Sequence, residues 1–72
     1  MARRFIEMAQ RDDPDSAYIG LEGIGLLSQS DKAVLATTSP GERSRLVMAY
    51  RGMIAIGKMG RNRLLEAALG IQ

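Results

Sequence analysis

The stretch from Ser39 to Gly57, with the sequence SPGERSRLVMAYRGMIAIG, contains the strongest structural signal in the chain. The Ser39 hydroxyl can accept a hydrogen bond from the amide of residue 42, and the Glu42 side chain can reach back to the Ser39 amide, which makes a capping box. Pro40 suits the first helical position. These signals predict a helix from Pro40 to about Gly57, in which Leu46, Tyr50, Met53 and Gly57 share one face. Because this helix is apolar on most sides, we expect it to be central to the domain.

Boundary signals upstream predict two more helices. A first helix over residues 2–11 ends at the sequence Asp12-Asp13-Pro14, because the residue before a proline is disfavoured in the helical region. Asp13 can cap a second helix that begins at Pro14.

Two further helices are expected around and after the central one. A short helix over residues 31–37 is capped by Ser30, and a last helix over residues 63–69 is capped by Asn62. Gly70 then suits a left-handed C-terminal cap.

The segment from residue 17 to residue 38 allows two structures. Its apolar residues have helical spacing, but Gly20, Gly23 and Gly25 each cost about 1 kcal/mol relative to alanine inside a helix. A short strand or hairpin within residues 17–38 is therefore the alternative. With that alternative open, the sequence predicts an all-α fold, a small bundle of three to five short helices that forms a single domain over residues 1–72.

The size and composition of the chain indicate whether it buries surface against a partner and in which compartment it is expected. The chain has 72 residues, 46% of them hydrophobic, and a domain of this size buries only about 60% of the surface that its unfolded chain exposes. Burial of apolar surface against another chain, such as a homodimer partner, is thus as well supported as a self-contained core. The absence of cysteine fits a reducing cytoplasm, and no run approaches the ~20 apolar residues of a membrane span.

The residue types exclude several classes of chemistry. The chain has no histidine and no cysteine, so zinc, haem and iron–sulfur sites lack their usual ligands, and a Ser-His-Asp triad cannot form. We therefore expect no enzymatic activity, no metal and no cofactor. Ser28 and Lys32 are four residues apart and could pair on a helix, but an ordinary surface pair is the better-supported interpretation.

The sequence Gly57-Lys58-Met59-Gly60 resembles locally the G-x-x-G loop with which KH domains clamp a sugar–phosphate backbone. The resemblance covers this loop and its immediate neighbours alone. A glycine-broken turn between two helices is the preferred interpretation.

Charge points to one half of the molecule as a binding surface. Residues 37–72 hold six Lys or Arg but only two Glu, so this half is basic. On an ideal helix Arg43, Arg51 and Lys58 lie within an arc of about 80° that also includes Val47 and Ile54. The predicted partner-binding residues are Arg43, Val47, Arg51, Ile54, Lys58, Arg61 and Arg63.

Two functions fit this surface. The first is a small cytoplasmic regulatory protein, associated with transcription or RNA, whose basic half binds nucleic acid or an acidic protein surface. The second is a protein-binding inhibitor or a dimerising adaptor that uses Val47, Ile54 and Met59 without contacting nucleic acid. Salt dependence of binding distinguishes them, since phosphate contacts weaken steeply as salt rises.

Overall fold

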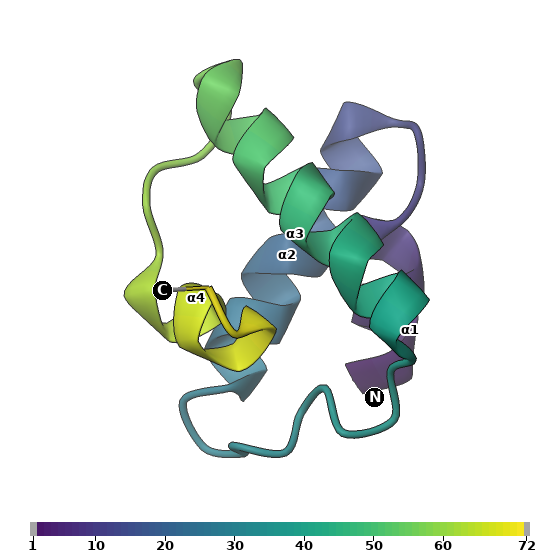
Figure 1. Ribbon diagram of the computed structural model, residues 1–72. Coiled ribbons are helices and arrows are strands. Elements are labelled where there is room, and N and C mark those ends of the chain that lie inside the picture. The colour runs from purple at the N-terminus through teal and green to yellow at the C-terminus, as the bar shows by residue number, and fades with distance from the viewer. Residues whose placement is uncertain (1, 72) are drawn as a thin grey trace.

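In a computed structural model, which describes residues 2–71, the chain forms four helices in sequence (Figure 1). These are α1 (Ala2–Ala9), α2 (Pro14–Leu27), α3 (Pro40–Ala55) and α4 (Arg63–Leu69). The described residues contain no strand, which confirms the prediction of a small all-α bundle.

Local capping explains where three of the helices begin. The Asp13 carboxylate accepts hydrogen bonds from the amides of residues 15 and 16 at 3.4 and 3.1 Å, ahead of α2. At the start of α3 the capping box forms in both directions, with Glu42 N to Ser39 Oγ at 3.1 Å and Ser39 N to the Glu42 carboxylate at 3.4 Å. Asn62 Oδ1 accepts from Leu65 N at 3.0 Å and caps α4.

The strand or hairpin considered for residues 17–38 is absent, because α2 is helical through all three of its glycines. Two of them allow α1 to pack closely on α2. A Cβ atom at Gly20 would overlap the α1 backbone at Phe5 and Ala9, and one at Gly23 would overlap the Phe5 ring. Close packing of α1 on α2 therefore offsets the poor helix propensity of glycine.

The prediction of a short helix over residues 31–37 was wrong, because this segment is a series of turns. The amide of Ala33 bonds to the Asp31 carboxylate at 2.9 Å rather than to a helical carbonyl. An aspartate that offers its side chain to a nearby amide competes with helix formation in this way. The turns place Val34 and Leu35 in the core.

The ends of two other helices also differ from expectation. The first helix ends at Ala9, two residues early, and α3 ends at Ala55 instead of Gly57. Gly57 has a φ of 74°, a left-handed conformation that reverses the chain direction after α3.

The core lies where the four helices meet. It contains residues from every helix, from the 31–38 turns and from the loop before α4: Ile6, Ala9, Ala17, Leu21, Ile24, Val34, Leu35, Leu46, Tyr50, Met53, Met59, Leu65 and Leu69. Of the four residues predicted to share one face of α3, Leu46, Tyr50 and Met53 are buried and form its inward face, whereas Gly57 lies beyond the end of the helix and is exposed. Since these three residues occupy one side of α3, its other side is left for the surface.

Candidate functional site

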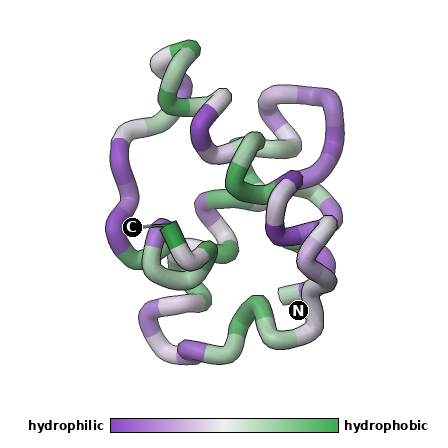
Figure 2. The backbone as a smooth tube through the Cα atoms, viewed as in Figure 1, coloured by the Kyte–Doolittle hydropathy of each residue, from purple (hydrophilic) through white to green (hydrophobic). Residues whose placement is uncertain are grey.

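The outward side of α3 is exposed and holds several of the predicted site residues. In Figure 1 α3 lies in front of α2, and no other described segment crosses the side that faces the viewer. Its C-terminal end projects at the top of that view, and Figure 2 shows hydrophobic residues there. Met48 is 73% exposed and Ile56, the C-terminal cap of α3, is 64% exposed. Large apolar side chains are thus uncovered on this helix.

This surface has two parts, defined from the helical spacing of 100° per residue. The basic flank consists of Arg43, Val47, Arg51 and Ile54. The apolar patch consists of Met48, Gly52, Ala55 and Ile56. Together they form what we call the α3 outer surface.

The basic flank contains one tethered and one free arginine. Arg43 is half-buried and donates from Nη2 to the carbonyl oxygen of Leu35 at 3.2 Å, so it also holds the 31–38 turns against α3. Arg51 is exposed, and within residues 2–71 it makes no hydrogen bond or ion pair. Both arginines border a shallow depression that is also lined by Pro40, Ser44, Val47 and Met48. Arg51 is therefore available to an anionic group that approaches this depression.

Lys58 does not extend the basic flank, contrary to the helical arc predicted for it. The helix has ended at Ala55, and the left-handed Gly57 redirects the chain. Lys58 Nζ instead pairs with the Asp15 carboxylate at 2.7 Å and lies 6.0 Å from the centre of the Tyr18 ring. The hydrogen bond to Asp15 raises the pKa of Lys58. This lysine joins the loop after α3 to the first turn of α2.

Arg61 is also engaged within the molecule. Its Nε donates to both oxygens of Glu66, at 3.0 and 3.3 Å. Glu66 accepts a hydrogen bond from the Tyr50 hydroxyl at 2.5 Å, and that hydroxyl in turn accepts from Asn62 N at 2.9 Å. The bonds from Tyr50 and then Arg61 lower the pKa of Glu66, whereas burial is the main cause that raises the pKa of Tyr50. This network attaches α4 to α3.

Arg63, the first residue of α4, is exposed. It lies on a different helix from the basic flank. The seven predicted residues thus divide into three groups: the flank of α3, the two tethered cations Lys58 and Arg61, and Arg63 on α4.

The apolar residues of the site also differ from expectation. Met59 was predicted to be available to a partner, but it is only 8% exposed and belongs to the core. The G-x-x-G turn therefore has one middle side chain buried and the other paired with Asp15. Sequence reasoning missed Met48 and Ile56 as site residues. Helical spacing placed Met48 opposite the inward face, which was the signal that could have found it.

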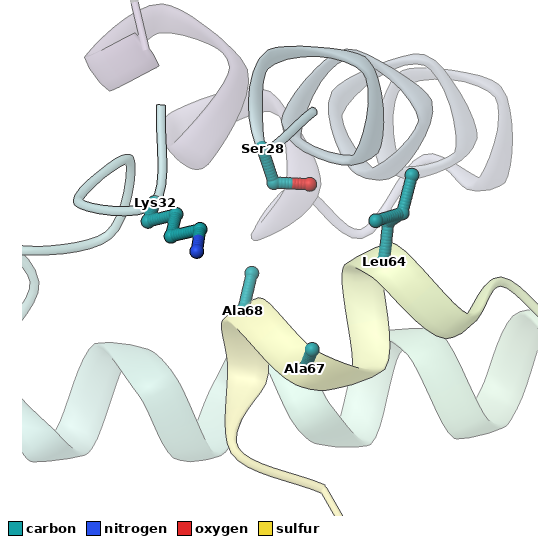
Figure 3. Close-up of a pocket in the computed structure, with 5 residues that line it drawn as sticks. All are labelled: Ser28, Lys32, Leu64, Ala67 and Ala68. Atoms are coloured by element: carbon teal, nitrogen blue, oxygen red, sulfur yellow. The ribbon is translucent and has the colours of Figure 1, made fainter. Parts of the chain in front are cut away.

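The predicted Ser28–Lys32 pair lies at the mouth of a separate cavity of about 240 Å³ between the end of α2 and α4. Figure 3 shows both side chains facing α4, where Leu64, Ala67 and Ala68 form the apolar wall. Ser28 Oγ donates to the Gly25 carbonyl at 2.8 Å. Because its proton is directed to its own helix and not to Lys32, the pair lacks the geometry of an activated nucleophile.

No group of three or more Asp or Glu side chains within residues 2–71 is placed to hold a metal ion, and no helix there is long and apolar enough to cross a membrane. No family model, no curated protein and no solved structure matches this chain.

Proposed function

We propose that this protein is a non-enzymatic, cytoplasmic regulatory protein that binds an acidic segment of a partner protein on its α3 outer surface. The observation that carries the proposal is the combination of an exposed, unpaired Arg51 with the 73% exposed Met48 on the same side of α3. Apolar contact supplies affinity in such a site, and a neighbouring cation selects the charge of the partner.

The charges of α3 favour an acidic partner. The helix contains three arginines, Arg43, Arg45 and Arg51, and a single carboxylate, Glu42. Glu42 is turned toward α1, where it pairs with Arg3 and accepts from Gln10 Nε2 at 3.0 Å. No carboxylate of α3 is left to neutralise Arg51 on the outer surface, so an anionic group of a partner can do so.

Nucleic acid is the alternative partner, and three features favour protein over it. Lys58 and Arg61 are already paired with carboxylates. The only aromatic residue of α3, Tyr50, is 2% exposed and cannot stack on a base. Met48 and Ile56 offer large apolar contacts that a phosphate backbone cannot use.

A binding experiment with defined probes tests the proposal. The first probe is a labelled helical peptide of about 20 residues, long enough to hold helix in water, with alanine and leucine on one face and glutamates beside them. The second is the same peptide with every glutamate replaced by lysine, and the third is duplex DNA. Fluorescence anisotropy at two salt concentrations measures each affinity. We expect the acidic peptide alone to bind, with a modest loss of affinity as salt rises.

Two matched double variants identify the surface that binds. Met48→Glu/Arg51→Glu should abolish binding, because it reverses the free charge and places a carboxylate on the apolar patch. Ile19→Glu/Arg4→Glu makes the same types of change at exposed positions of α2 and α1 and should bind as the wild type does. Failure of the wild type to bind the acidic peptide, or tighter binding of DNA that weakens steeply with salt, would overturn the proposal.

A further inference from the structure

The three glycines of α2 have clear packing roles, whereas the two glycines of α3 do not. A Cβ atom at Gly41, in the first turn of α3, would make only ordinary contacts at 3.9 Å. Gly20 and Gly23 are required by α1, and a Cβ atom at Gly25 would lie 2.8 Å from Asn62 Nδ2. A Cβ atom at Gly52 would meet nothing within 4 Å. Glycine weakens a helix interior relative to alanine, so the fold of this chain gains nothing from Gly52.

The neighbours of Gly52 are the exposed residues of the apolar patch. Met48 precedes it by one helical turn and Ile56 follows it by one turn, and both are more than half exposed. Ala55 is exposed beside them. Residues four apart lie above one another on a helix, so Gly52 forms a low point between two large apolar side chains.

One unpaired arginine lies close to this low point. Arg51 adjoins Gly52 in sequence and is exposed. Arg45 lies two turns before Gly52 on nearly the same side of α3, but its guanidinium points back to Gly41, about 16 Å along the helix from Gly52, and its Nε donates to Gln10 Oε1 at 2.8 Å. A partner that lies over Gly52 therefore meets the Arg51 guanidinium.

We propose that the occupant of the α3 outer surface is an acidic amphipathic α-helix that crosses α3 at Gly52, where its backbone comes into direct contact with that of α3. This inference rests on the proposed function and specifies the geometry of its partner. Absence of a side chain at the crossing point lets two helices approach closely, as small residues do at helix–helix contacts. Met48 and Ile56 then pack on either side of the partner helix, and its carboxylates pair with Arg51.

A second copy of this chain fits the surface less well. A symmetric pairing of two α3 helices through Gly52 would bring the Arg51 side chains of both copies to the same interface. Like charges that oppose one another at an interface are destabilising, and Glu42 is turned away to Arg3 and Gln10. The charges thus select a partner of opposite sign.

Substitution of Gly52 separates binding from stability. Gly52→Ala adds one methyl group in open space, so the thermal midpoint should rise because alanine favours the helix. The same methyl group keeps the partner helix away, and the affinity for the acidic peptide should fall by about tenfold or more. Gly52→Leu should weaken binding further. Gly60→Ala is the control, since Gly60 also faces open space but lies outside the patch, and its affinity should equal that of the wild type.

The outcomes distinguish this inference from the function on which it rests. If Gly52→Ala and Gly52→Leu bind the acidic peptide as the wild type does while Met48→Glu/Arg51→Glu does not, the surface is correct and the close crossing at Gly52 is wrong. If the wild type does not bind the peptide, the proposed function and this inference fall together. Sedimentation of the free protein as a dimer that Gly52→Ala dissociates would identify a second copy as the occupant and overturn the acidic helix.

Discussion

At the scale of single residues, two glycines that both lie inside helices have opposite surroundings. Gly20 faces the α1 backbone, whereas Gly52 faces open space. We expect Gly20→Ala to lower the free energy of unfolding by about 1–3 kcal/mol, since the added methyl group must push α1 away from α2. Urea unfolding followed by circular dichroism measures this change.

Gly52→Ala is the matched control for that measurement. It adds the same methyl group and should raise the free energy of unfolding by about 0.5–1 kcal/mol. Equal effects of the two substitutions would show that the α1–α2 contact does not require glycine at position 20.

At the scale of the helices, α4 depends on a few polar contacts. It has only seven residues, and the Tyr50 hydroxyl of α3 binds both Glu66 and the Asn62 amide at its start. Tyr50→Phe keeps the ring in the core but leaves that amide and Glu66 without this partner. We expect a loss of about 1–3 kcal/mol in the free energy of unfolding. Hydrogen exchange should show that the amides of α4 lose more protection than those of α2.

Tyr18→Phe is the control, because it tests whether removal of any tyrosine hydroxyl lowers the free energy of unfolding as much as Tyr50→Phe does. Tyr18 is half-buried, and its hydroxyl makes no hydrogen bond within residues 2–71. Its removal should change the free energy of unfolding by about 0.5 kcal/mol or less. A Tyr50→Phe protein as stable as the Tyr18→Phe protein would mean that the network with Glu66 does not hold α4.

At the scale of the whole molecule, carboxylates join the parts of the fold and make its stability depend on pH. The hydrogen bonds from Arg3 and Gln10 lower the pKa of Glu42 from 4.5 to about 2, and those from Tyr50 and Arg61 lower the pKa of Glu66. Because both pKa values are lower in the folded state, the unfolded chain takes up protons first as the pH falls. Their contribution to stability is complete above about pH 4.5 and, for Glu42, is lost as the pH falls to about 2.

Glu42→Gln isolates the larger of these effects. The variant should be less stable than the wild type at pH 7, because Arg3 loses its ion pair across α1 and α3. As the pH falls toward 2, the difference in unfolding free energy should shrink, since the wild-type carboxylate becomes neutral as well. Chemical unfolding at a series of pH values measures both proteins, and a difference that stays constant with pH would contradict the assignment to Glu42.

The sequence alone determined the features that depend on near neighbours. The caps at Asp13, Ser39 and Asn62 and the shared face of Leu46, Tyr50 and Met53 follow from hydrogen bonds and helical spacing between near neighbours, and the structure confirms each of them. The same signals favoured an all-α fold, but only the structure excluded the strand or hairpin considered within residues 17–38. The segment from residue 31 to residue 37 was mispredicted because its local preferences are weak, and Asp31 offers a competing hydrogen bond.

Only the tertiary structure decided which surface residues are free. Lys58 pairs with Asp15, and Arg61 and Tyr50 share Glu66, through contacts that no helical spacing encodes. Met59 enters the core because the chain reverses at Gly57. The physical reason is that an ion pair or a buried contact between distant residues depends on how the helices pack. Helical periodicity could therefore locate the basic flank, whereas packing left Arg51, Met48 and the open side of Gly52 uncovered.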